Sequence, residues 1–240
     1  MPPARPNGRP RSTLLREVLE GIFYFLRSGC SWRNLPGDLP PWGTVWTYVR
    51  NWRDDGAIEQ VHETLRGQVR TVVGKDVAPS AASLDSQSVQ TTDTPGPRGF
   101  AAGKQVNGRK RRLLVDTLGL IHGLVVHPAD IQDRDGAKLV LKQAKDRRPR
   151  WERVWADGGS QGALVEWVAA ETGWTLEIVK RPDGAEGFVV VAHRWIVERT
   201  CAWLARCRRL RASYERTVAS EEALIRLAMI GVMLRRWRRT

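Results

Sequence analysis

The chain contains few of the residues on which disulfide frameworks and zinc sites are built. Its 240 residues include 3 cysteines and 4 histidines. The cysteines (Cys30, Cys201 and Cys207) lack the Cys-x-x-Cys spacing, and the histidines supply no His-x-x-x-His pair. These absences argue against both kinds of site. We therefore expect a reduced, cytoplasmic protein without transition metals.

Long apolar runs are also lacking. A membrane-spanning helix needs roughly 18 consecutive apolar residues. The best candidate, 223–234, is too short and is interrupted by Arg226. The start of the chain, Met1 to Arg5, has no apolar stretch typical of a signal peptide. The sequence therefore predicts neither a membrane partner nor export.

Acidic residues are in deficit. The chain has 26 Asp and Glu residues and 39 Lys and Arg residues, which gives a net charge of +13. A basic excess of this size favours nucleic acid as the partner. The length suits one large domain, or a small one followed by a medium one.

The first part of the chain has helical periodicity. Apolar spacing predicts three short helices, over 13–28, over 44–52 and after Gly56. They follow a Pro-rich, basic arm (1–11) and precede a linker near 71–83. Three short helices joined by tight turns are typical of a helix-turn-helix module. Thr47, Arg50 and Asn51 of the middle helix are candidates for base contacts. A merely structural helix is an equal alternative.

From residue 84 onward strands and helices alternate. Strands are predicted up to Asp85 and over 113–116, 120–126, 153–156 and 175–179, and helices over 133–145, 161–171, 191–210 and 221–239. A hairpin followed by alternating strands and helices predicts an α/β domain with a mixed sheet covered by helices.

Three acids stand in separate settings on this scaffold. Asp85 ends the first strand, Asp157 precedes a Gly-Gly turn, and Glu198 lies in an Arg-rich helix. Sites in open α/β sheets form beyond the carboxyl ends of strands, so the two aspartates meet if their strands are neighbours. Carboxylates bind Mg²⁺ or Mn²⁺, and three of them can hold two ions for phosphodiester chemistry. Taken singly, each acid has a structural alternative: a turn, a helix cap, or a partner of Arg194.

Several segments resemble a known family. The segments 84–89, 115–119, 127–130, 155–159 and 194–200, together with 30–36 and Pro41-Trp42, are similar to DDE-type transposases of bacterial insertion sequences. The branch they resemble is that of insertion sequence five. The chain departs from the family pattern at Val191, where a Tyr is frequent, and at Arg206, a basic residue one place late.

The resemblance implies a fold and an activity. It implies a helical, helix-turn-helix-like DNA-binding domain over 1–72 and a ribonuclease-H-like catalytic domain over 80–240. Asp85, Asp157 and Glu198 would bind two Mg²⁺ or Mn²⁺ ions and carry catalysis. The substrate would be double-stranded DNA: the inverted-repeat ends of the element, cut at the 3′ strand and joined to a target. A homo-oligomer on nucleoid DNA in the bacterial cytoplasm would be the working form.

Basic residues near these acids are candidates for DNA contact. Arg109, Lys110, Arg111 and Arg112 form an acid-free run, and Arg194 and Arg206 flank Glu198. We favour contacts with phosphates, which would position DNA without reading its sequence, over the alternative of a solvated basic loop. Asp133 opens a helix, where an acid suits the helix dipole, so a structural role is expected for it.

Two alternatives to a transposase stay open. One is a transposase-derived DNA-binding protein without catalysis, such as a repressor or a remnant, which a start later than is usual in the family would favour. The other is a repair or recombination nuclease of the same fold, which would cut without regard to terminal repeats.

Overall fold

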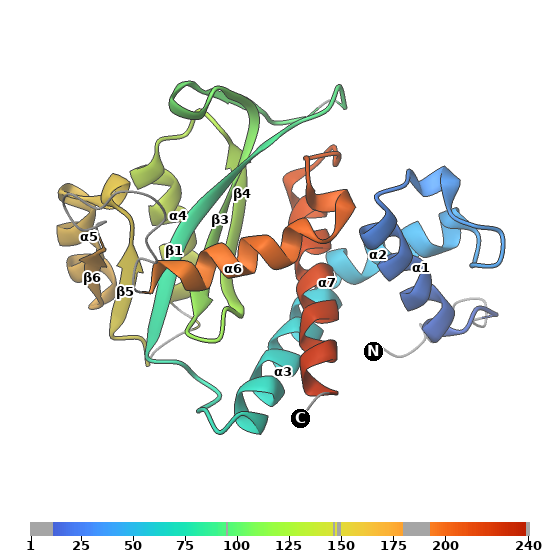
Figure 1. The fold of residues 1–240 in the computed structure, drawn as a ribbon, viewed down its shortest axis with the longest axis horizontal. Helices are drawn as coiled ribbons and strands as arrows, with labels where there is room; N and C mark the ends of the chain where they lie inside the picture. The colour runs from blue at the N-terminus through green and yellow to red at the C-terminus, as the bar shows by residue number, and fades with distance from the viewer. Residues whose placement is uncertain (1–11, 95, 146, 148–149, 180–192, 239–240) are drawn as a thin grey trace.

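The structure is a computed structural model that describes residues 12–94, 96–145, 147, 150–179 and 193–238. Six strands form one mixed sheet, with seven α-helices around and beside it in the described part of the chain. The helical N-terminal part and the strand β6 lie at opposite ends of the molecule, with α3 and α7 between them (Figure 1). The predicted α/β class with a mixed sheet and flanking helices is confirmed.

The N-terminal part contains the three predicted helices. They are α1 (Leu15–Ser28), α2 (Trp42–Asp54) and α3 (Ala57–Val72), with a 3₁₀ turn at Trp32–Asn34. Gly29 ends α1 in the left-handed region, at a φ of 73°. Leu14 stands at the N-cap of α1 and makes no side-chain hydrogen bond there.

The sheet has the order β2-β3-β1-β5-β6, and β4 also pairs with β3. The strands are β1 (Ala81–Gln90), β2 (Gly99–Ala101), β3 (Val106–Asp116), β4 (Ile121–Pro128), β5 (Arg153–Ala156) and β6 (Thr175–Ile178). β1 runs antiparallel to β3 and parallel to β5, and β5 runs parallel to β6. β1 therefore joins an antiparallel half of the sheet to a parallel half.

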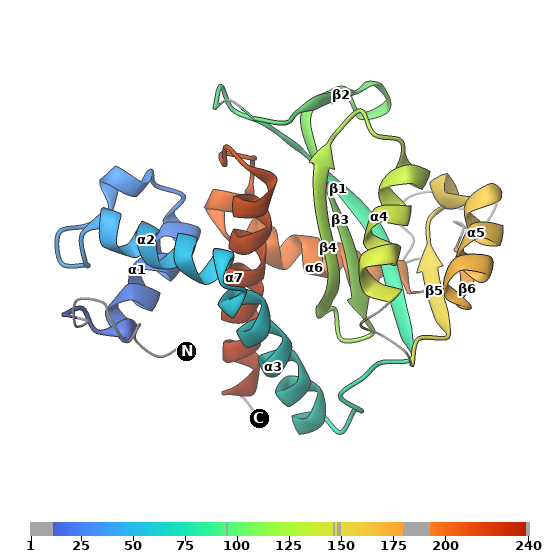
Figure 2. The same ribbon diagram turned by 180° about the vertical axis from the view of Figure 1, so that it is seen from behind.

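Helices cover both faces of this sheet. The remaining helices are α4 (Asp133–Lys145), α5 (Ala163–Thr172), α6 (Arg194–Ala205) and α7 (Val218–Trp237), with 3₁₀ turns at Ala102–Lys104, Gly158–Ser160 and Arg208–Leu210. α6 crosses β1 and β3 on one face (Figure 1), and α4 packs on the other face (Figure 2). Residues of β3 alternate between them: Leu113 lies in the core under α6 and α7, and Leu114 in the core under α4.

The core beneath α7 is shared with the N-terminal helices. Buried residues of α1, α2 and α3 form one cluster with α6, α7, β3 and β4. Val18 and Ile22 of α1, Val45 of α2 and Met229 of α7 are all 0% exposed within it. The helical part is thus packed on the sheet and α6 through α7, and the segment between α3 and β1 is not its only connection to them.

Two predicted boundaries are corrected. Asp85 lies inside β1 and not at its end, because β1 continues to pair with β3 as far as Gln90↔Gly108 after its pairing with β5 stops at Ser83↔Trp155. The helix predicted over 191–210 is α6, which ends at Ala205 and is followed by the turn at Arg208–Leu210. Val191, the arm 1–11 and the segment 180–189 lie outside the described residues. Among the helices that the structure describes, none is long and apolar enough to cross a membrane.

Candidate active site and nucleic-acid surface

The parallel pair β1 and β5 brings two of the three candidate acids together. The last paired residues are Ser83 and Trp155. The same register, continued by two residues, sets Asp85 opposite Asp157. Burial raises the pKa of the Asp85 carboxyl, and the negative charge of Asp157 raises it further, against the backbone N–H of Ser86, which donates to Oδ1 at 2.6 Å. The two carboxylates are therefore electrostatic neighbours.

This pair lies on the face of the sheet that α6 covers. Asp85 pairs in register with Leu113, whose side chain belongs to the core on that face. Ser83, two residues earlier and hence on the same face, donates to the carbonyl of His193 at 2.9 Å. The rings of Trp155 and His193 stack with centroids 3.9 Å apart. The start of α6 is thus fixed beside the aspartates.

Glu198 stands one turn into α6. Its side chain is 52% exposed, and its Oε1 lies 3.8 Å from a terminal nitrogen of Arg194. Cys201, three residues further along the helix, is close enough to Asp85 and to Glu198 to be affected by the charge of each. Burial, followed by the charges of Asp85 and Glu198, raises the pKa of its thiol to about 12. The helix therefore carries Glu198 to the same side as the aspartate pair.

The three acids do not converge on one point in this conformation. Among the described residues, no group of three or more His, Cys, Asp or Glu side chains is arranged to hold a metal ion. Arg194 interacts with both Glu198 and Asp85. It pairs with Glu198, and its positive charge opposes the rise in the pKa of Asp85. The structure thus brings Asp85 to Asp157 and leaves Glu198 turned toward Arg194.

A fourth carboxylate, Asp133, borders the Gly158-Gly159 turn. A Cβ added to Gly159 would lie 3.5 Å from an oxygen of Asp157 and 3.7 Å from an oxygen of Asp133. Burial alone would raise the pKa of Asp133, but Arg112 and Lys110 hold it below its usual value. The sequence indicated only a helix-opening acid here, because the approach of Asp133 to the Gly158-Gly159 turn arises from tertiary folding between segments far apart in the chain.

The basic run on β3 is not a DNA-binding loop. Arg109, Lys110, Arg111 and Arg112 are 1%, 7%, 0% and 3% exposed. Arg109 and Arg111 form ion pairs with Glu221 of α7. Lys110 and Arg112 form ion pairs with Asp133 of α4. The predicted phosphate contacts of these four residues are therefore wrong. β3 is an inner strand with helices on both faces, and its acidic partners are remote in sequence.

The middle N-terminal helix presents an aromatic stripe with a basic end. Val45, Val49 and Trp52 of α2 are buried. Trp42 and Trp46 are 42% and 39% exposed, and the Arg50 guanidinium lies 4.8 Å from the Trp46 ring centroid. Trp42, Trp46 and Arg50 follow one another at four-residue spacing, a sequence signal for this stripe, and the two tryptophans were not among the predicted DNA contacts.

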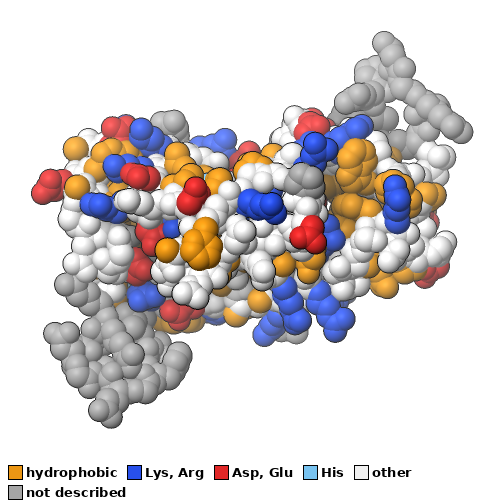
Figure 3. Space-filling view, turned by 90° about the horizontal axis from the view of Figure 1, so that it is seen from above, with side chains coloured by type: hydrophobic (Ala, Val, Ile, Leu, Met, Phe, Trp, Pro, Cys, Tyr) orange, Lys and Arg blue, Asp and Glu red, His pale blue; other side chains and the backbone are white. Residues whose placement is uncertain are grey.

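The other predicted base readers of α2 are less open. The Thr47 hydroxyl donates to the carbonyl of Gly43 at 2.7 Å, and Thr47 and Asn51 are both half-buried. Arg206, just beyond α6, is exposed. On the face seen in Figure 3, Lys and Arg side chains stand beside exposed hydrophobic ones, a combination suited to nucleic acid.

Comparisons with known proteins identify the family. Residues 78–233 match the family described as "Transposase DDE domain", and residues 1–62 match "Putative transposase of IS4/5 family". The chain is also similar to the "Insertion element IS402 uncharacterized 16.2 kDa protein" of Burkholderia cepacia, with 30% identity over 96 residues, 38% of this chain and 64% of that protein. The chain thus spans less than two thirds of that relative. Because the DDE match covers more than half of the chain, the protein belongs to the DDE transposases of bacterial insertion sequences.

Proposed function

We propose that the protein binds the terminal inverted repeats of an insertion sequence, cleaves the DNA there with divalent metal, and joins the ends to a target. The observation that supports this proposal is the parallel register of β1 and β5, whose last pair is Ser83 and Trp155. Continued by two residues, this register would bring Asp85 opposite Asp157. The net charge of +13 supports a DNA substrate. Asp85, Asp157 and Glu198 are the proposed catalytic residues.

The strand order supports a ribonuclease-H-like catalytic domain. The antiparallel strands β4, β3 and β1 are followed by β5 and β6, which run parallel to β1. Asp85 and Asp157 lie at the carboxyl end of the parallel pairing, where sites form in sheets of this kind. We assign the catalytic domain to 80–240 and the DNA-binding domain to 1–72, whose α2 offers Arg50 for DNA contact.

The aspartate pair fits a divalent cation. The pKa of Asp85 is raised by burial and then by Asp157, and a cation between the two carboxylates would relieve this repulsion. Glu198 would reach the pair by giving up its contact with Arg194. That contact is partly exposed, and such pairs contribute about 0–1 kcal/mol. Two Mg²⁺ or Mn²⁺ ions, when bound, would activate water or a 3′-hydroxyl and stabilise the leaving oxygen.

The test separates cleavage from binding. Asp85→Asn, Asp157→Asn and Glu198→Gln are each expected to reduce Mg²⁺- or Mn²⁺-dependent nicking of a duplex that carries an element end by at least about 100-fold, the loss of a principal catalytic group. Binding of the same duplex in EDTA should stay unchanged. Asp135→Asn, an exposed acid of α4, is the matched control. A variant that nicks at the wild-type rate refutes the assignment of its residue.

A DNA-binding protein without catalysis is the second candidate. The arrangement of Glu198 favours it, because the described residues include no three-ligand cluster. In that case the wild-type protein would bind end-containing DNA and fail to nick it with either metal, whereas nicking by the wild type would exclude it.

A further inference from the structure

Arginine and tryptophan alternate along the outer side of α6. Trp195, Arg199 and Trp203 follow one another at four-residue intervals, so their side chains stack along the helix. The Arg199 Cζ lies 4.5 Å from the ring centroid of Trp195 and 4.9 Å from that of Trp203. Arg236 of α7 extends the series, with its Cζ 4.1 Å from the Trp203 centroid. These four residues are called the Arg–Trp stack below.

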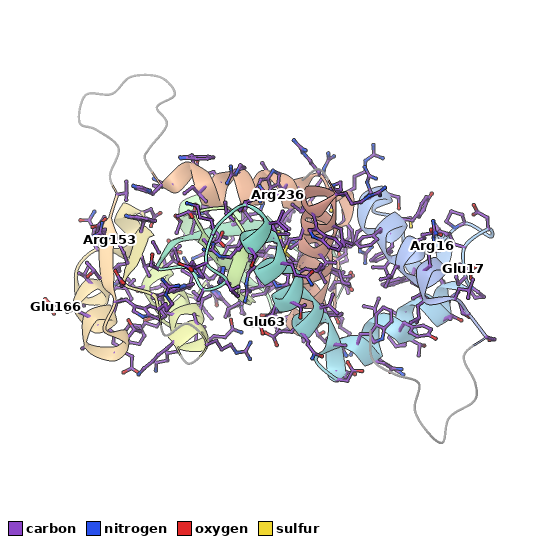
Figure 4. The ribbon with its side chains drawn as sticks, turned by 90° about the horizontal axis from the view of Figure 1, so that it is seen from below. Arg16, Glu17, Glu63, Arg153, Glu166 and Arg236 are labelled. Atoms are coloured by element: carbon purple, nitrogen blue, oxygen red, sulfur yellow. The ribbon has the colours of Figure 1, made fainter. Side chains whose placement is uncertain are left out.

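The two guanidinium groups of the stack border a cavity. It has a volume of about 330 Å³ and lies between α3, the β3–β4 turn, α6 and α7. Its walls are formed by residues that include Val69, Val72, Leu118 and Trp237, besides Arg199 and Arg236. Figure 4 shows Arg236 in the middle of the molecule, where these helices meet. A cavity with apolar walls and two cationic groups suits an anion attached to an apolar body.

The charge of Arg199 is not matched by an acid. Within the described part of the chain it forms no ion pair, and its Nε is buried without a hydrogen-bond partner. Asp116 is the acid whose negative charge acts on Arg199. Its carboxylate already accepts hydrogen bonds from Arg70 and from the backbone N–H groups of Leu118 and Leu120. A buried donor without an acceptor destabilises a fold. A bound ligand that supplies the acceptor would explain why this donor is left unpaired in the chain.

The two guanidinium groups lie close enough to interact electrostatically. Burial lowers the pKa of both Arg199 and Arg236, and the charge of Arg199 lowers that of Arg236 further. The indole rings hold the Arg199 guanidinium in place through cation–π contacts on both sides. The result is a fixed positive site one residue from Glu198, formed before any ligand arrives.

We propose that the Arg–Trp stack and its cavity bind a phosphate of the DNA backbone, with Arg199 and Arg236 as the ligating residues. This inference rests on the proposed function, since it adds a contact for the strand that passes the aspartate pair and Glu198. Planar guanidinium groups match phosphate oxygens in a bidentate geometry. The apolar wall can receive a sugar, while the partly exposed Trp195, at 42% exposure, can contact a base.

The experiment measures the salt dependence of DNA binding without cleavage. A labelled duplex of arbitrary sequence is titrated with protein in EDTA at several salt concentrations, because a phosphate contact is independent of sequence. The variants are Arg199→Gln, Arg236→Gln and the double variant. Arg153→Gln is the matched control, since Arg153 is exposed, lies at the far end of the molecule (Figure 4), and pairs with Glu177. Arg199→Lys keeps the charge but loses the planar group.

The slope of log K against log salt is negative, and each lost phosphate contact should reduce its magnitude by about 0.9. We expect about this loss for each single variant, about twice it for the double variant, and none for Arg153→Gln. Arg199→Lys should keep the slope and bind several-fold more weakly. Wild-type slopes for Arg199→Gln and the double variant overturn the proposal. So does a thermal midpoint of Arg199→Gln well below that of the wild type, with an unchanged slope, which would reveal a structural arginine.

A second arm distinguishes DNA from free phosphate. Pyrophosphate that raises the thermal midpoint of the wild type but not of Arg199→Gln, with wild-type salt slopes on DNA, would show an anion site unrelated to DNA and overturn the assignment. Because binding is measured in EDTA, the result is independent of nicking. Failure of the wild type to nick would refute the catalytic proposal and leave this one standing.

Discussion

Arg111 of β3 donates to Glu221 of α7 across 2.7 Å, and neither side chain is more than 1% exposed. The other oxygen of Glu221 accepts from Arg109 at 2.9 Å and from the hydroxyl of Ser213. Arg111 also donates to the carbonyl of Leu210 at 2.6 Å. One buried carboxylate therefore ties α7 and the turn after α6 to the middle strand of the antiparallel half of the sheet.

Glu221→Gln should destabilise the fold strongly. The substitution removes the negative charge between two buried cations, and breaking a buried pair typically costs about 3–5 kcal/mol because the remaining charge is uncompensated. Urea unfolding, followed by circular dichroism, gives the change in the free energy of unfolding. Glu166→Gln on the exposed side of α5 is the matched control and should change it by less than about 0.5 kcal/mol. Equal stability of the two variants would contradict the structural role of Glu221.

The same network shows what sequence reasoning can and cannot recover. The bounds of α4 and β5 were predicted from periodicity alone, because their apolar residues repeat at helical or strand spacing. The sequence predicts a basic surface segment at 109–112, since the run itself contains no acid. Its partners, Asp133 and Glu221, lie 21 to 112 residues away in the hydrogen-bonded pairs, and local patterns carry no information on such pairings.

The candidate site was predictable to a similar extent. The strand order made the meeting of Asp85 and Asp157 a consequence of topology. The length of β1 was missed because its second half, with Ser86, Gln87 and Ser88, is polar and is held mainly by pairing with β3. The approach of Asp133 to the Gly158-Gly159 turn depends on where α4 packs, which no residue spacing specifies.

A second buried carboxylate, Asp116, predicts how stability depends on pH. Burial alone would raise its pKa, but His122, the backbone N–H of Leu120 and Arg70 together lower it below 3.8. The folded-state pKa is thus below the unfolded one. The stabilisation by the Asp116 carboxylate is therefore fully present above pH 3.8 and is lost as the pH falls through the folded-state pKa.

The difference in the free energy of unfolding between the wild type and Asp116→Asn should follow this rule. It should be large above pH 3.8, where the variant leaves Arg70 without its charged partner, and should shrink as the pH falls below that value. Urea midpoints at several pH values measure it. Asp135→Asn, whose carboxylate is 62% exposed, should show no such trend. A difference that grows toward low pH would mean that the sign of the shift is wrong.

The exposed stripe of α2 predicts the order of effects on DNA recognition. Arg50 extends over Trp46 on the open side of the helix, whereas Thr47 uses its hydroxyl on Gly43 and Asn51 is half-buried. Arg50→Ala should therefore weaken binding of an end-containing duplex more than Thr47→Val or Asn51→Ala does. Trp46→Ala should have an intermediate effect, because it frees the Arg50 side chain without removing its charge.

Competition anisotropy with a scrambled duplex distinguishes a base contact from a phosphate contact. If Arg50 reads a base edge, Arg50→Ala lowers the preference for the element end over the scrambled duplex by about 1–3 kcal/mol. If it contacts only phosphate, both duplexes lose affinity equally and the magnitude of the salt slope decreases by about 0.9. Arg134→Ala on the exposed start of α4 is the control for charge and should retain the preference. Unchanged binding by Arg50→Ala would remove α2 from the proposed DNA surface, and leave the stack on α6 as the main basic contact of the described chain.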